Sequence, residues 1–288
     1  MGVTHNRELI TPEKAKEYLA ANCVNRKIRQ DRVRAITRDI LGDAWKETHQ
    51  GIAFDTEGKL IDGQHRLTAI VNANKAVYMD VARGVEHEAG AYVDSGITRR
   101  YTDAIVFDGR FNDNPAMRHK ETPAMLKTLI RLEIPFIRSM SNHEVMTLME
   151  MLSDELQKMY HIAVTRGQYS AAAVKAAAMA ALMCGESEDD LYHFFSIFCN
   201  SDDSGCEGKN TGVVWNWKQQ ILSAKLHNRS FTQDALYNGT QNAIYNFCRN
   251  SNVKTIKLTS ERRYNVKPRL VELITKTSGD PTDIKVRK

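Results

Sequence analysis

The chain has 288 residues, of which 42% are hydrophobic and 26% are charged, and its formal net charge is +5. This composition is ordinary for a globular protein, and no apolar run approaches the roughly 18 residues that a membrane-spanning helix needs. Five cysteines without regular spacing and the lack of a secretory signal pattern predict reduced thiols, a cytoplasmic protein and no membrane partner.

The first elements predicted along the chain are two helices. Thr11-Pro12-Glu13 suits a helix start, because threonine is a good N-cap, proline fits the first helical position and an acid is favourable in the first turn. Apolar residues at helical spacing predict a second helix over residues 31–41, whose outer face and approach are rich in arginine.

A strand pair and a further helix follow. Apolar residues alternate on both sides of the turn DTEG at 55–58, which predicts a hairpin. Asp62-Gly63 ends the second strand, and from Gln64 the apolar spacing is helical again. The predicted strand segments are residues 52–54, 59–61, 77–83 and 92–93.

The pattern is helical after Pro115. Ser141 and Glu144 form a capping box, and an alanine-rich helix begins near Ser170 and stops at Gly185. Further helices are predicted over residues 191–198, 213–226 and 232–248.

This order of elements predicts an α+β protein of two domains. Residues 1–112 form a small domain with a mixed sheet, and residues 113–288 form an all-helical domain. Residues 249–288 hold 11 Lys and Arg against 4 Asp and Glu, so the net positive charge lies in this C-terminal segment. Such a segment attracts a polyanion such as DNA, unless it is a solvated surface without a partner. The candidate nucleic-acid contacts are Arg262, Arg263, Lys267 and Arg269.

The sequence Asp62-Gly63-Gln64-His65-Arg66 lies where a predicted strand turns into a helix. A helix N-terminus presents unpaired N–H groups and the positive end of the helix dipole, which together suit a phosphate. Gly63 allows an anion to approach the backbone, Arg66 can bind phosphate oxygens through two N–H groups, and His65 adds a donor. Asp62 is suited to hold a metal carried by a nucleotide or to orient His65. The alternative is structural: Asp62 caps the helix, Gly63 makes the turn, and His65 and Arg66 face solvent.

The pattern IxFDxxGxLIDGQHRLTAIV resembles the nucleotide-binding core of the ParB/sulfiredoxin superfamily, which includes chromosome-partitioning ParB proteins, sulfiredoxins and a free-serine kinase. The stretches ITPEKAKEYLAANCVNRKIRQDRV, DGQHRL and VDSGITRRYTDAI are together similar to a phage-associated group of ParB-like proteins, and VVWNW is similar to a motif in the helical part of that group. The resemblance is specific over residues 9–108. It implies a ParB/sulfiredoxin-like fold for the N-terminal domain.

The resemblance also implies a nucleotide site. Gly63, His65 and Arg66 match the residues that hold nucleotide phosphates in the superfamily, with Gln64 between them. The implied ligand is a nucleoside triphosphate, CTP or ATP, with Mg²⁺. Gln64 stands where sulfiredoxin has its reactive cysteine, which excludes sulfinic acid reduction at this turn.

A second polar cluster, DSGITRR, lies at residues 94–100. Asp94 and Gly96 suit a turn, and the arginines after it would reach the same phosphates or a DNA backbone; the alternative is a polar loop with solvated arginines. The resemblance to the phage-associated group adds Asp94 and Arg99 to the nucleotide site.

Three functions are compatible with these features. The first is a nucleotide-dependent switch of phage type that acts with DNA in the host cytoplasm and that can form a homodimer. The second is an NTP-dependent phosphotransferase or NTPase, with DNA or a modified base among its acceptors, in which Asp62 or His65 is the base and Arg66 stabilises phosphate charge. The third is a scaffold or interaction protein without a ligand. No zinc-ligand spacing occurs, so we expect no metal site of the protein's own.

Overall fold

The computed structural model describes residues 2–22, 27–86, 111, 114, 121–162, 171–259 and 261–278. The chain divides into two compact units. Unit 1 comprises residues 1–100, 137–148 and 271–288, and unit 2 comprises residues 101–136 and 149–270. The predicted domain boundary at residues 112–113 lies outside the described residues.

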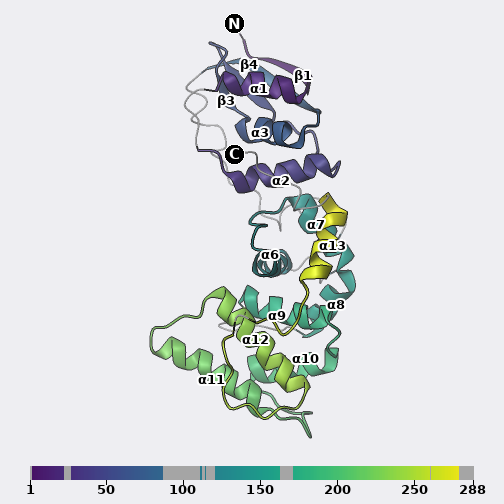
Figure 1. The fold of residues 1–288 in the computed structure, drawn as a ribbon, viewed down its shortest axis with the longest axis vertical. Helices are drawn as coiled ribbons and strands as arrows, with labels where there is room; N and C mark the ends of the chain where they lie inside the picture. The colour runs from purple at the N-terminus through teal and green to yellow at the C-terminus, as the bar shows by residue number, and fades with distance from the viewer. Residues whose placement is uncertain are drawn as a thin grey trace. The chain divides into compact units, whose positions relative to one another are not determined.

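Unit 1 contains a four-stranded mixed sheet with the strand order β1-β4-β2-β3. Strand β4 pairs antiparallel with β1 and parallel with β2, and β2 pairs antiparallel with β3. This sheet confirms the predicted α+β class (Figure 1). The elements are β1 (Thr4–Ile10), α1 (Pro12–Ala20), α2 (Gln30–Leu41), β2 (Ile52–Asp55), β3 (Leu60–Asp62), α3 (Gln64–Ala73) and β4 (Val77–Val85).

The core of unit 1 lies between one face of the sheet and the helices α1, α2 and α3. Val77, Met79 and Val81 alternate along β4 and are all buried, as a strand with one covered face requires. Leu67 and Ile70 of α3 are fully buried against the same core. The helices therefore cover a single face of the sheet and fix the position of the turn that precedes α3.

Strand β1 is an element of unit 1 that the sequence did not predict. Its sequence THNRELI has no apolar alternation, and its first six residues are exposed or only partly buried. It is an edge strand that forms because its backbone pairs with β4 over the whole length from Thr4 to Ile10. Backbone pairing of this kind leaves little trace in side-chain patterns.

The predicted capping box at Ser141 and Glu144 is confirmed at the start of α7 (Asn142–Met151). The Glu144 N–H donates to Ser141 Oγ at 3.1 Å, and the Ser141 N–H donates to Glu144 Oε2 at 2.8 Å. The same carboxylate pairs with Arg38 of α2, with Nη2 3.1 Å from Oε2, and Arg38 also donates to the Ser139 carbonyl at 2.6 Å. Both side chains of this ion pair are at most 4% exposed, so it fastens residues 137–148 to α2 inside unit 1.

Asp39 of α2 makes this packing sensitive to pH. Its Oδ1 accepts a 2.5 Å hydrogen bond from Ser141 Oγ. Burial and the neighbouring Glu144 charge raise the pKa of Asp39 to about 7, against the opposing effects of Ser141 and Arg38. The folded state then holds the Asp39 proton more tightly than the unfolded chain does. The contribution of Asp39 to the free energy of unfolding is therefore complete below about pH 4, and it is lost as the pH rises towards 7.

We therefore expect Asp39→Asn to unfold less readily than the wild type at pH 8, by about 1–3 kcal/mol, with little difference at pH 4. Asparagine keeps the acceptor for Ser141 and carries no charge to bury. Urea denaturation of both proteins at pH 4, 6 and 8 measures the difference. A difference in free energy of unfolding between the two proteins that stays constant from pH 4 to pH 8 would contradict a raised pKa of Asp39.

The regular elements described in unit 2 are helices, with the π-helical turn η3 (Ser196–Asn200) after α10. Figure 1 shows them grouped around α9 and α12, which pack against each other. The helices outside unit 1 are α6 (Thr122–Glu133), α8 (Ser153–Ile162), α9 (Ala172–Met183), α10 (Glu188–Phe195), α11 (Gly212–Leu226) and α12 (Gln233–Cys248). A last helix, α13 (Lys267–Ser278), begins in unit 2 and ends in unit 1.

Two local features explain the close packing in unit 2. The alanine-rich helix α9 is buried from Ala173 to Leu182, because small side chains let neighbouring helices approach it. A Cβ on Gly239 of α12 would lie within 2.3 Å of the Trp217 ring, so glycine is required where this tryptophan packs. Trp217 is fully buried and donates to Thr240 Oγ1 at 3.1 Å, which makes it a core residue. Across the described residues no helix is both long and apolar enough to cross a membrane.

Candidate functional site

The turn between β3 and α3 depends on Gly63. This residue is the N-cap of α3 and has φ +105°, a conformation that side chains disfavour. A Cβ at this position would lie 3.1 Å from Cγ1 and 3.2 Å from Cα of Ile52 on β2. Glycine is therefore needed both for the backbone conformation and for the close approach of the neighbouring strand.

We expect Gly63→Ala to lower the free energy of unfolding by about 2–3 kcal/mol, through backbone strain together with crowding against Ile52. Gly58 is a matched control, because it has φ +78° and a Cβ added there would have no atom within 4 Å. Gly58→Ala should cost only about 1 kcal/mol of strain. Equal losses of stability in the two variants, measured by urea denaturation, would show that crowding against Ile52 is unimportant.

Asp62 and Arg66 form an ordered pair across the first turn of α3. Asp62 Oδ1 accepts from the Gly63 N–H at 2.6 Å, and its Oδ2 accepts from Arg66 Nη2 at 2.8 Å. Arg66 Nη2 also donates to the Gly51 carbonyl at 2.6 Å, and the arginine side chain is 13% exposed. Its Nε is buried and has no hydrogen-bond partner within the described part of the chain. The guanidinium is thus held in place through two of its five N–H donors, both on Nη2.

His65 and Gln64 are buried, with exposures of 7% and 5%. His65 Nε2 accepts from the backbone N–H of Arg29 at 3.0 Å, so in this arrangement the ring proton of a neutral His65 lies on Nδ1. The part of the structural alternative in which His65 faces solvent is therefore wrong, and the contact that His65 makes is a structural one. His65 fastens the residues before α2 to the start of α3, and its Nε2 lone pair is engaged.

Arg29 joins the site through this contact. Its backbone lies beside His65, while its side chain is 71% exposed and pairs with Asp31 at 2.9 Å. The sequence placed Arg29 in the basic approach to the second helix but did not connect it with the turn at residues 62–66. The signal available was the cluster NRKIRQDR, whose partner in the fold cannot be read from spacing.

The arrangement can bind an anion at the start of α3. The first N–H groups of a helix have no intrahelical acceptor, and the dipole favours negative charge there. Arg66 supplies an oriented guanidinium in the first turn of α3. The two remaining predicted ligands, Asp94 and Arg99, lie outside the described residues.

In the basic C-terminal segment, two of the four candidate nucleic-acid contacts have acidic partners in unit 2. Arg262 lies 2.9 Å from Asp234 and 3.1 Å from Glu133, and its side chain is 22% exposed. Arg269 pairs with Glu155. These ion pairs hold Arg262 and Arg269 against the helices, which leaves fewer of their donors for DNA.

The other two candidate contacts, Arg263 and Lys267, are both exposed on the surface of unit 2. Side-chain amides of α11 and α12 bind the main chain of residues 251–266. Gln220 binds both backbone groups of Ile256, with its Oε1 3.1 Å from N and its Nε2 3.4 Å from O. Gln241 Oε1 accepts from the Arg263 N–H at 3.0 Å.

This main-chain anchoring leaves side chains of the segment available to face outward. Lys254 and Lys257 are exposed, and the Lys257 carbonyl accepts from Asn242 Nδ2 at 3.1 Å. We define Lys254, Lys257, Arg263 and Lys267 as the basic strip. The sequence did not single out Lys254 and Lys257, because their orientation depends on the amides of α11 and α12.

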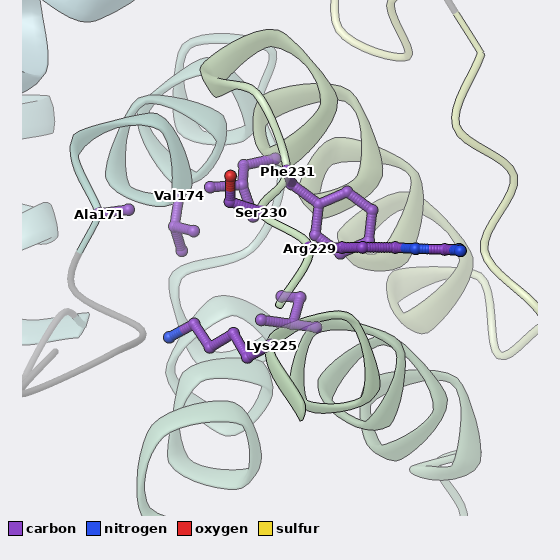
Figure 2. Close-up of a pocket in the computed structure, with 8 residues that line it drawn as sticks. Ala171, Val174, Lys225, Arg229, Ser230 and Phe231 are labelled. Atoms are coloured by element: carbon purple, nitrogen blue, oxygen red, sulfur yellow. The ribbon is translucent and has the colours of Figure 1, made fainter. Parts of the chain in front are cut away.

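Unit 2 also has a small apolar pocket of about 100 Å³ between α9, α11 and the start of α12. Its walls include Val174 and Phe231, and Figure 2 shows Lys225 and Arg229 extending from it in opposite directions. The volume suits one aliphatic side chain. None of the site residues predicted from the sequence lines this pocket.

Comparisons with protein-family models, curated proteins and solved structures found no match. The resemblance to the ParB/sulfiredoxin superfamily therefore stays a prediction carried by the sequence motifs. In the part of the chain that the structure describes, no group of three or more His, Cys, Asp and Glu side chains is arranged to hold a metal ion.

Proposed function

We propose that unit 1 binds a nucleoside triphosphate, CTP or ATP with Mg²⁺, with its phosphates at the N-terminal end of α3. The observation that carries this proposal is Arg66, whose guanidinium is oriented by Asp62 and by the Gly51 carbonyl in the first turn of α3. An oriented arginine beside a helix N-terminus is the arrangement that favours phosphate.

The charges at the turn support an anion that brings its own cation. Asp62 already accepts from Gly63 and Arg66, so its carboxylate neutralises part of the positive charge. Arg29 is likewise paired with Asp31, so the positive potential at this turn comes mainly from the α3 dipole and from the N–H donors of Arg66. A magnesium ion carried by the triphosphate would neutralise the remaining negative charge of the phosphates without a dedicated metal site on the protein.

Equilibrium binding of ATP, CTP, GTP and UTP, each with magnesium, tests the proposal. We expect saturable binding with one triphosphate preferred. Chromatography of the recovered nucleotide then separates the two ligand-dependent functions: an intact nucleotide supports a switch, and a converted one supports phosphoryl transfer or hydrolysis. Failure of all four triphosphates to bind would remove the proposed nucleotide function and leave the scaffold alternative.

We further propose that the switch acts with DNA through the basic strip. The triple variant Lys254→Ala, Lys257→Ala, Arg263→Ala should bind duplex DNA more weakly and reduce the slope of log K against log salt by about 2–3, since each phosphate that a basic side chain neutralises adds close to 0.9 to that slope. Fluorescence anisotropy over a salt series measures both quantities.

The control removes the same charge from exposed lysines elsewhere. The triple variant Lys16→Ala, Lys46→Ala, Lys158→Ala changes the net charge equally and touches no residue of the strip. An equal fall in affinity in the two variants would mean that net charge alone attracts DNA. Unchanged affinity in the strip variant would place the DNA-binding surface elsewhere.

A further inference from the structure

Unit 1 contains a cleft of about 820 Å³ that the sequence motifs did not indicate. It lies where the end of α1, the turn after β2 and the end of β4 meet, and no residue of the turn at 62–66 lines it. Its volume is within the range of small-molecule sites, which is roughly 300–1,000 Å³. The cleft is therefore large enough for a ligand and separate from the phosphate site proposed above.

Arg83 of β4 lines the cleft and is held by two side chains. Its Nη1 donates to Glu8 Oε1 at 2.5 Å, and its Nη2 donates to the Tyr18 hydroxyl at 2.7 Å. Tyr18 in turn donates to Glu8 Oε2 at 2.7 Å, and Lys14 Nζ lies 2.6 Å from the same oxygen. Burial alone would raise the pKa of Glu8, but these three partners together lower it to about 2. Glu8 is thus ionised at neutral pH and holds the Arg83 guanidinium in one orientation.

The Arg83 guanidinium lies beside two aromatic rings. The Tyr18 and Phe54 rings meet edge to face with centroids 4.8 Å apart, and Arg83 Cζ lies 5.7 Å and 5.5 Å from their centroids. The Arg83 side chain is 38% exposed. A guanidinium has five N–H donors, and two of them have partners here, so about three are left within the described part of the chain.

The charges around the cleft select against a phosphate. Arg83 and Lys14 are balanced in part by Glu8, and the rim adds the carboxylates of Glu17 and Asp55. The group as a whole carries no surplus of positive charge for a multiply charged anion. What it offers is a flat guanidinium face beside two aromatic rings, with spare donors in the plane. Such a surface stacks on a heteroaromatic ring and donates to its carbonyl or ring-nitrogen acceptors.

We infer that this cleft binds an uncharged, planar heteroaromatic ring with carbonyl or ring-nitrogen acceptors, the chemistry of a nucleobase. Arg83 stacks on the ring and donates to it, and Tyr18 and Phe54 supply the apolar surface. The site is independent of the proposed triphosphate site, because it needs no phosphate and shares no residue with the turn at 62–66.

Titration of the full chain with uridine, cytidine, adenosine and guanosine, followed by protein NMR, tests the inference without a phosphate. We expect at least one nucleoside to bind and to shift signals of cleft residues. Arg83→Lys keeps a charge beside Glu8 but removes the planar face, so it should weaken binding at least tenfold. Tyr18→Phe removes the hydroxyl that orients Arg83 while keeping the ring, and should weaken binding less. The NMR spectrum of each variant shows whether it is folded.

Arg66→Ala separates this inference from the proposed function. Nucleoside binding should be unchanged in Arg66→Ala and weakened in Arg83→Lys, whatever the outcome for triphosphates. No binding of any nucleoside, equal binding by folded Arg83→Lys, or weakening in Arg66→Ala alone would overturn the inference. Competition by a short single-stranded oligonucleotide identifies the source of the ring. If the oligonucleotide displaces the nucleoside, the natural ligand is a base within a strand; if it does not, the ligand is a free small molecule. Both results support a ring-binding site.

Discussion

Replacing Arg66 with alanine should weaken the binding of the preferred nucleoside triphosphate about 10- to 150-fold, which corresponds to about 1.5–3 kcal/mol for a charge-assisted hydrogen bond. The reason is geometric. Asp62 and the Gly51 carbonyl orient the guanidinium at the start of α3, so its remaining donors meet a phosphate without a further loss of side-chain freedom. Isothermal titration with the wild type and the variant measures the change.

Two further variants make this result specific. Arg66→Lys keeps the charge but not the two-pronged donor, and should give an intermediate affinity. Lys75→Ala removes one positive charge just beyond the other end of α3, where Lys75 pairs with Asp43, and should leave the affinity within about twofold. Because Arg66 also binds the Gly51 carbonyl, the urea midpoint of each variant must be measured as well. Unchanged affinity in folded Arg66→Ala would remove the phosphate assignment of this turn.

The largest effect on stability is expected from Glu144→Ala. Glu144 is fully buried, pairs with the buried Arg38 and completes the capping box with Ser141. Alanine would leave the Arg38 charge buried without its carboxylate, which typically costs about 3–5 kcal/mol. Urea denaturation followed by circular dichroism should therefore show a large fall in the free energy of unfolding.

An exposed ion pair provides the contrast. Glu57 and Lys59 lie 2.5 Å apart at the hairpin turn, and their side chains are 69% and 51% exposed. Glu57→Ala should change the free energy of unfolding by less than about 1 kcal/mol, as is usual for exposed pairs. A small effect of Glu144→Ala, comparable to that of Glu57→Ala, would mean that water reaches Arg38 and that the pair does not hold residues 137–148 in place.

Local signals predicted much of the fold. Thr11 caps α1 by accepting from the Lys14 N–H at 3.2 Å, and the hairpin turn and the start of α3 lie where the sequence placed them. Caps, turns and glycine positions act over a few residues, so they are visible in the sequence. The helices predicted over residues 191–198, 213–226 and 232–248 are confirmed, except that η3 replaces the last turn of the first of them. The described residues between α12 and α13 are not helical, although the pattern after Pro115 predicted helix.

The features that were missed depend on distant partners. Whether an arginine faces solvent or an acid cannot be read from its neighbours in sequence, so the acidic partners of Arg262 and Arg269 were not predicted. The burial of His65 depends on Arg29, 36 residues earlier. The same holds for the cleft, since Glu8 and Arg83 are 75 residues apart in the chain. The candidate residues of the turn at 62–66 could be singled out because they are consecutive.

The amide anchors of residues 251–266 separate two tasks that most surface segments combine. Gln220, Gln241 and Asn242 bind main-chain atoms, which every amino acid possesses, so the path of the segment does not depend on its outward side chains. Those side chains can change by mutation with little effect on folding. The outward side chains of the basic strip can therefore be substituted, and its binding partner can change during evolution, while the helices beneath it stay the same.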